Sequence, residues 1–204
     1  MRWNEIEFAM RKQWFGDTRD YVKWSFVYSE ASPNASVCYI AMARPDEIKG
    51  TVHPTVIRFF DKSKDLGLVR EMFSEHFLAL LDGYGKAQRH EYFDQAESLI
   101  KEGQSMDRVV IFIDPDTGIE PPSGGDSRHI CLADLRRLCD LLRSGDKLIV
   151  YQHAPIMRKK TWIEDGLGRI LDGEWTRSYR VTSYHNTDCA SEVCFLKFER
   201  SKTS

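Results

Sequence analysis

Runs of apolar residues divide the chain into strand-like and helix-like segments. Three short runs rich in β-branched and aromatic side chains are typical of buried strands: 36–42, 108–113 and 147–152. The run 108–113 (RVVIFI) is apolar at five successive positions, so both faces of this strand should be covered, as in the middle of a parallel sheet. Residues 55–60 are a further strand candidate. The pattern predicts that the three main strands are adjacent and parallel, with 108–113 in the middle.

Apolar positions three and four residues apart predict helices between these strands. The helix 18–30 follows a Gly-Asp-Thr turn, whose side chains can accept the free amide hydrogens of a helix start. The helix 89–102 should end at Gly103 and the helix 131–143 at Ser144-Gly145, because glycine commonly ends helices. The other predicted helices are 3–13, 65–82 and 161–171.

The pattern of apolar and polar residues changes near the end of the chain. Residues 179–185 and 193–199 alternate more strongly around a polar turn, which predicts an antiparallel hairpin. Upstream, strand 108–113, its following helix and strand 147–152 make a βαβ unit with a right-handed crossover. The predicted fold class is therefore α/β: a three-layer sandwich around a mostly parallel, Rossmann-like sheet with a C-terminal antiparallel hairpin. A length of 204 residues suits one domain, 1–204.

Charge and cysteine content narrow the classes of function. A formal net charge of -2 argues against binding nucleic acid over the whole surface, so any such contact should come from a local patch. The cysteines number five and form no Cys-x-x-Cys pair, which indicates buried thiols in a reducing compartment rather than disulfides or a zinc site. No segment is typical of a signal peptide or a membrane span. We expect a cytoplasmic protein with no membrane attachment.

Polar residues follow the two central strands at the point where each strand ends. Asp114 and Asp116 come after one strand, while Gln152 and His153 end the other. Ligands of open α/β sheets bind beyond the carboxyl ends of the strands, so we expect these four side chains to line one pocket. Asp114, Asp116 and His153 are the predicted catalytic residues, and Gln152 a substrate-binding one. Asp114 could bind an amine, a sugar hydroxyl or a metal, or it could simply cap the following loop.

Two further positions belong to the same hypothesis. Thr117 and Gly118 should lie on the rim of the pocket and contact substrate. Asp61 ends the strand candidate 55–60, where many Rossmann-like enzymes hold a cofactor ribose through an acid; capping a helix is an equally good interpretation.

Two other arrangements of charge suggest different ligands. Asp114, Asp116 and Glu120 could gather a divalent metal, since hard cations take oxygen ligands. Arg158-Lys159-Lys160, with Trp162 nearby, could meet the phosphates and a base of a nucleic acid. A short basic run is also common on an ordinary solvated surface.

Two segments of the chain resemble known methyltransferases. Residues 114–118 (DPDTG) resemble the acidic-Pro-Pro-aromatic loop of methyltransferases that act on exocyclic amino groups in nucleic acids. They also resemble the Asp-Pro-Phe-Gly segment of the three-cysteine-motif partner proteins, a bacterial methyltransferase-like group. Residues 16–24 (GDTRDYVKW) are similar to the N-terminal Asn/Asp…Asp-x-x-Lys segment of the ribosomal-RNA adenine methyltransferase family. A parallel sheet closed by a hairpin is also an architecture of many such enzymes.

The resemblance implies a function and a set of residue roles. Asp114 would orient the amine to be methylated, Lys23 would contribute to substrate binding, and S-adenosylmethionine would be the methyl donor. Arg158, from the basic run described above, is a further candidate for substrate binding. Two departures bear on this. The family's second proline and its base-stacking aromatic are Asp116 and Thr117 here. The first strand leads into AMARPD, with no glycine before Gly50, although the donor needs small residues for close approach to the backbone. We therefore predict weak or absent binding of S-adenosylmethionine.

Three functions remain open from the sequence. The first is a methyltransferase-like protein that modifies an exocyclic amine of a nucleic acid. The second is a metal-dependent nuclease or phosphoester hydrolase that uses the three acids named above. The third is a non-catalytic Rossmann-like binding module.

Overall fold

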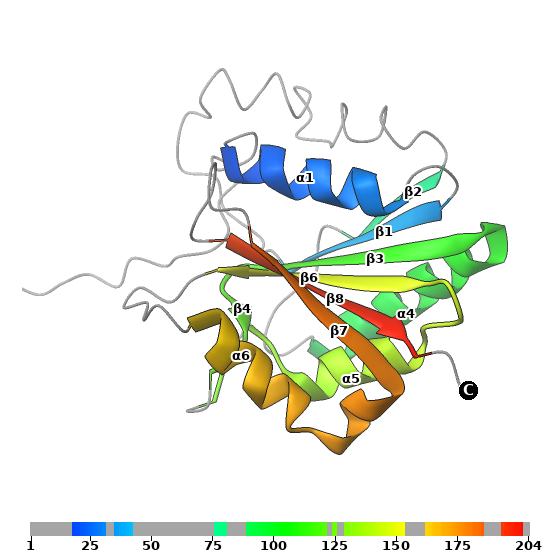
Figure 1. Ribbon diagram of the computed structural model, residues 1–204. Coiled ribbons are helices and arrows are strands. Elements are labelled where there is room, and N and C mark those ends of the chain that lie inside the picture. The colour runs from blue at the N-terminus through cyan, green and yellow to red at the C-terminus, as the bar shows by residue number, and fades with distance from the viewer. Residues whose placement is uncertain are drawn as a thin grey trace, which may run out of the picture.

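The computed structural model of the chain describes residues 18–31, 35–42, 76–80, 89–121, 124–125, 129–153, 162–185 and 193–201. In this part of the chain, a six-stranded sheet has the order β2-β1-β3-β6-β8-β7 (Figure 1). The strands are β1 (Ala35–Met42), β2 (Phe77–Leu80), β3 (Arg108–Pro115), β6 (Lys147–His153), β7 (Tyr179–His185) and β8 (Val193–Arg200).

The central strands are arranged as the sequence predicted. β3 lies between β1 and β6 and is parallel to both, and β2 pairs with β1 in parallel on the far side. All residues of β3 after Arg108 are buried. A strand that is apolar on both faces is stable only where both faces are covered, and the middle of the sheet provides this environment.

The hairpin at the end of the chain completes the sheet. β8 is antiparallel to β6 on one side and to β7 on the other. The last strand therefore lies between β6 and β7 instead of at the sheet edge. The expected fold class is confirmed: a mostly parallel, Rossmann-like sheet that ends in an antiparallel hairpin.

Helices cover both faces of the sheet and form the predicted three layers (Figure 1). On one face lies α1 (Thr18–Ala31), whose Trp24 and Val27 pack in an apolar core with Tyr39 and Phe112. The opposite face is covered by α4 (Arg89–Met106), α5 (Leu132–Asp140) and α6 (Trp162–Leu171). The remaining described elements are a parallel pair, β4 (Gly118–Ile119) with β5 (His129–Ile130), and a 3-10 helix, η4 (Glu174–Ser178).

The predicted helix 65–82 is wrong at its C-terminal end. Residues 77–80 form β2, and Phe77 to Leu80 pair in register with residues 37–40 of β1. The segment FLAL is a continuous apolar run, which fits a buried parallel strand as well as one turn of a helix. Pairing with β1 decides between them. The predicted helix 3–13, the strand candidate 55–60 and residues 65–75 lie outside the described residues.

Two predicted helix ends are also corrected. α4 continues past Gly103 to Met106, because this glycine is a packing position. A Cβ atom at Gly103 would lie 2.7 Å from Cys38 Sγ, so glycine lets the helix approach β1 closely. α5 ends at Asp140, three residues earlier than predicted. Gly145 has a φ of +92° in the turn that leads into β6, where its lack of a side chain is needed.

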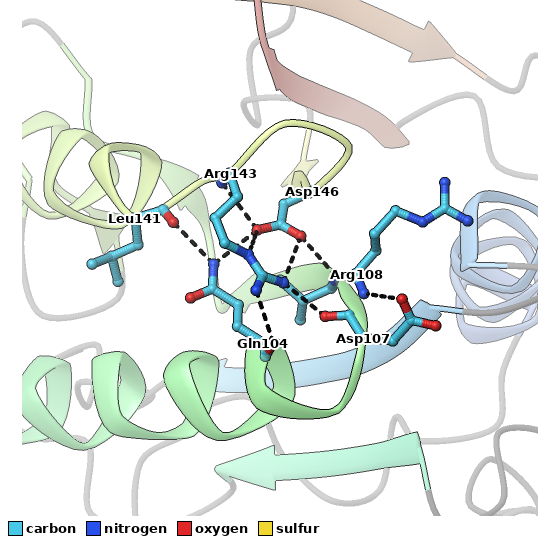
Figure 2. A network of polar contacts seen from close by, with 7 residues as sticks. Gln104, Asp107, Arg108, Leu141, Arg143 and Asp146 are labelled. Carbon is cyan, nitrogen blue, oxygen red and sulfur yellow. Dashed lines mark hydrogen bonds and ion pairs between the residues drawn. The ribbon is translucent and has the colours of Figure 1, made fainter.

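A buried carboxylate fastens the amino-terminal edge of the sheet (Figure 2). Asp146, 1% exposed, accepts hydrogen bonds from Val109 N at 3.0 Å, Arg143 N at 3.0 Å and Gln104 Nε2 at 2.8 Å. Arg143 also donates to the carbonyl oxygens of Gln104 and Asp107 near the end of α4. These bonds connect α4, β3 and the turn before β6. They stabilise the edge opposite to the one where ligands of such sheets bind.

None of the described helices is both long and apolar enough to cross a membrane. The described cysteines are free thiols. Burial, reinforced by nearby acids, raises the pKa of Cys38 to about 12, and burial likewise raises the pKa of Cys194 to about 12. These two thiols are therefore protonated at neutral pH and are poor nucleophiles.

Candidate functional site

Asp114 is the centre of a buried polar cluster at the carboxyl edge of the sheet. It follows five consecutive buried apolar residues of β3 and has no exposed surface. Its Oδ2 atom accepts a hydrogen bond from Lys23 Nζ at 2.8 Å and another from the Tyr39 hydroxyl at 2.9 Å. The cluster therefore joins the middle strand, its neighbour β1 and the helix above them.

The sequence of α1 explains why Lys23 is buried. Val22, Trp24 and Val27 turn toward the sheet, and Trp24 packs edge-on against Tyr39 and Phe112. Lys23, 4% exposed, is carried into the interior with them, and its Nζ lies 4.5 Å from the centre of the Tyr151 ring. A buried ammonium needs an opposite charge, and Asp114 supplies it. Lys23, which the resemblance implies to be a substrate-binding residue, therefore contacts Asp114, the residue expected to bind the substrate amine.

The second oxygen of Asp114 differs from the first. Oδ1 is buried and has no hydrogen-bond partner among the described residues. The hydroxyl oxygen of Thr117, three residues further on, is in the same condition. Leaving a buried polar atom unpaired costs about 1–3 kcal/mol, and more for a charged group. An unpaired buried atom at this edge of an α/β sheet is a candidate position for a hydrogen-bond donor from a ligand.

Gln152 does not share a pocket with Asp114, contrary to the prediction. The neighbouring Tyr151 faces α1 beside Lys23, so Gln152 points to the opposite face of the sheet. There its Oε1 accepts a hydrogen bond from Ile119 N at 2.7 Å. Gly118 lies against it with a φ of +93°, and a Cβ at Gly118 would come within 2.5 Å of the Gln152 amide. Gln152 therefore fixes the course of the loop after β3.

The remaining predicted residues have different outcomes. Asp116 and Thr117 are half-buried in the same loop. The backbone of His153 ends β6 and pairs with Val193, but its side chain is not among those described. Arg158 and Asp61 lie outside the described residues. The strand paired with β1 is 77–80, and the first acid after that strand in the sequence is Asp82 rather than Asp61.

The proposed metal site is not formed. Among the residues that the structure describes, no three His, Cys, Asp or Glu side chains are close enough together to hold a metal ion. Glu120 is used differently: its Oε1 accepts a hydrogen bond from Leu132 N at 2.9 Å, at the first residue of α5. Asp114, Asp116 and Glu120 therefore do not form the metal site that the hydrolase hypothesis required of them.

Tyr39 and Tyr151 are site residues that the sequence did not single out. Both belong to apolar strand segments, in which a tyrosine is normally counted as a core residue. The only signal in the sequence is the phenolic hydroxyl, which requires a partner when it is buried. Tyr39 finds this partner in Asp114, one strand away.

The described residues do not form the open, glycine-lined crevice that a methyl donor requires. The hydroxyl of Tyr92, from α4, donates to the carbonyl of Ala41 at 2.7 Å and reaches that of Leu80 at 3.4 Å. These carbonyls lie near the carboxyl ends of β1 and β2, and Tyr92 is 1% exposed. The turn after β1 lies outside the described residues, and its sequence has no glycine before Gly50.

Comparisons with known proteins find only solved structures of low similarity. No family model matches the chain, and no curated protein matches it. A release-factor-specific protein-(glutamine-N5) methyltransferase from Alicyclobacillus acidocaldarius is 13% identical over 93% of this chain and 97% of its own, with a TM-score of 0.44. An rRNA methylase from Streptococcus thermophilus is 13% identical over 89% and 96%, with a TM-score of 0.42. Scores below 0.5 carry no argument about activity, so the fold assignment rests on the strand order.

Proposed function

We propose that this chain is a methyltransferase-like protein that binds an exocyclic amine of a nucleic-acid base at Asp114. The observation that carries the proposal is the half-satisfied carboxylate at the end of the central strand. Lys23 and Tyr39 hold one oxygen, and the other is left for a donor from a ligand. An amino group on a base is a donor that suits it.

Each residue of the cluster has a definite task in this proposal. Lys23 and Tyr39 fix the carboxylate by two hydrogen bonds to the same oxygen, so its second oxygen is held in one orientation. The Tyr151 ring beside Lys23 and the closed surroundings exclude water. Hydrogen bonds to a charged acceptor are stronger where water is excluded. The pre-oriented oxygen would therefore select and orient an N–H group.

The finer family relationship and the cellular setting belong to the same proposal. Likeness to the three-cysteine-motif partner proteins and the ribosomal-RNA adenine methyltransferase group is supported by Asp114-Pro115 at the end of the central strand and by Lys23 facing it. Phosphate contacts would come from the local basic run Arg158 to Lys160, since the net charge of the chain is -2. Such a protein would work in the cytoplasm.

A non-catalytic binding module is the second candidate. The observation that favours it is the Tyr92 hydroxyl between the ends of β1 and β2, together with the missing glycines. In this case the amine is bound and no methyl group is transferred. Asp114 has the same role in both candidates.

Deletion of the amine tests the proposal. Short single-stranded RNAs that contain adenosine or cytidine would be compared by fluorescence anisotropy with RNAs in which the matching riboside lacks only the amino group. The wild type should prefer the amine by about tenfold, as expected for a hydrogen bond to a charged group. The double variant Lys23→Met/Asp114→Leu removes both charges and should show no preference. Equal binding of both RNAs by the wild type would refute the proposal.

A further inference from the structure

The polar cluster at Asp114 already contains its counter-ion. Lys23 Nζ lies 2.8 Å from Asp114 Oδ2, and the two side chains are 5% and 0% exposed. Their charges cancel inside a region from which water is excluded. Asp114 Oδ1, the oxygen without a partner among the described residues, therefore belongs to a neutral ion pair and is not an uncompensated negative charge.

We infer that Asp114 selects a neutral N–H donor, such as an arylamine or an amide, and rejects cations of the same shape. This inference rests on the proposed function and specifies the charge of its ligand. An ammonium, an amidinium or a metal ion at Oδ1 would share one small carboxylate with the ammonium of Lys23. Like charges placed together in a buried site repel strongly because the surroundings screen them poorly. A neutral donor gains the hydrogen bond without this repulsion.

The side chains around the pair are largely aromatic. Tyr39 and Phe112 are stacked, with ring centres 5.6 Å apart, and Tyr151 lies under Lys23. The unpaired hydroxyl of Thr117 adds a second polar atom that can either donate or accept. No group of acids that could hold a metal is present among the described residues.

Benzamide and benzamidine are suitable probes because they have nearly the same shape and differ in charge at neutral pH. Each would be titrated into the full chain, and binding followed by chemical-shift changes of the tyrosine ring signals. Asp114 has no exposed surface, so neither probe can reach it unless nearby residues of the protein move. The two probes have nearly the same shape, so this movement should be the same for both. The wild type should bind benzamide more tightly than benzamidine by about tenfold or more.

Removal of the counter-ion should invert this preference. Lys23→Met keeps the length of the side chain and removes its charge, so Asp114 becomes an uncompensated carboxylate that prefers benzamidine. The matched control is Lys101→Met, since Lys101 is a 63% exposed lysine on α4. It should keep the wild-type preference. Lys23→Met/Asp114→Leu has neither charge and should bind neither probe at this site.

The outcomes separate the two claims. A wild type that binds benzamidine as well as benzamide overturns the inference and leaves the amine site in place. A wild type that binds neither probe, with no preference between the amine-bearing and amine-lacking RNAs, overturns the proposed function and the inference with it. If Lys23→Met does not fold, the wild-type comparison of the two probes decides alone.

Discussion

At the scale of single residues, the side chain of Asp114 combines two properties that are usually separate. It forms a buried ion pair, and it keeps one oxygen without a described partner. A buried ion pair is seldom more stable than apolar side chains of the same volume, because two charges must leave water. Keeping it at the ligand-binding edge therefore favours a role in binding over a role in folding.

A double-mutant cycle on Lys23 and Asp114 tests this view. Lys23→Met or Asp114→Leu alone leaves one buried charge unpaired and should lower the free energy of unfolding by about 3–5 kcal/mol. The double variant should be as stable as the wild type within about 1 kcal/mol. Urea unfolding followed by circular dichroism measures all four proteins. A double variant that is destabilised by several kcal/mol, about as much as either single variant, would show that the pair is mainly structural.

At the scale of elements, α1 is positioned by charges at its C-terminal end. Glu30 Oε2 contacts Lys147 Nζ of β6 at 2.8 Å and Lys197 Nζ of β8 at 3.1 Å. Burial alone would raise the pKa of Glu30, but the hydrogen bonds and charges of the two lysines outweigh it and lower the pKa below 4.5. Since α1 also carries Lys23, this anchor helps to determine where Lys23 lies.

The anchor predicts a defined pH dependence. A carboxylate whose pKa is lowered on folding contributes stability above its unfolded pKa, and this contribution is lost as the pH falls through the folded pKa. Glu30→Gln should therefore cost about 1–2 kcal/mol at neutral pH, and the difference from wild type should shrink on acidification below 4.5. Urea midpoints at several pH values measure it. Glu174→Gln, in a highly exposed ion pair, is the control and should show almost no difference.

Two helical glycines distinguish packing from helix propensity. Gly103→Ala in α4 should destabilise the protein by about 1–3 kcal/mol, because the new methyl group meets Cys38 Sγ at 2.7 Å. Gly168→Ala in α6 has no atom within 4 Å of the new methyl group and should stabilise by up to about 1 kcal/mol. Melting temperatures of the two variants should move in opposite directions. A stabilised Gly103→Ala would contradict the close approach of α4 to β1.

The sequence predicted which main elements occur and in which order, but it did not predict which face of the sheet each side chain takes. Apolar runs identified β1, β3 and β6, and the acid directly after the apolar run 108–113 marked Asp114 as a site residue. The shared pocket of Asp114 and Gln152 could not be judged, because a strand that is apolar on both faces does not show which face each side chain takes. The segment FLAL was misassigned for a related reason: a short apolar run fits either element, and only its pairing with β1 decides.

At the scale of the whole molecule, two regions at the carboxyl edge of the sheet differ in their polar contacts. The region at Asp114 is built from α1, β1, β3 and β6 and has a buried acceptor without a described partner. The region between the ends of β1 and β2 is bridged by the Tyr92 hydroxyl. The amine-binding half of a methyltransferase-like site is therefore better supported than the donor-binding half.

Calorimetry with S-adenosylmethionine tests this asymmetry. We expect no saturable binding at micromolar concentrations, because the chain after β1 has no glycine before Gly50 to permit close approach to the backbone. The demethylated product S-adenosylhomocysteine should behave in the same way. Low-micromolar affinity for either ligand would show that another part of the chain holds the donor, and it would favour an active enzyme over the binding module.

The most direct test of the central claim observes the Asp114 carboxylate itself. Aspartate side chains labelled with ¹³C at Cγ would be followed by NMR, and the Asp114 signal assigned by its loss in Lys23→Met/Asp114→Leu. The amine-bearing RNA should shift the Asp114 signal, and the RNA that lacks only the amino group should leave it in place. An Asp114 signal that stays unmoved while the amine-bearing RNA binds and shifts other signals would contradict the account.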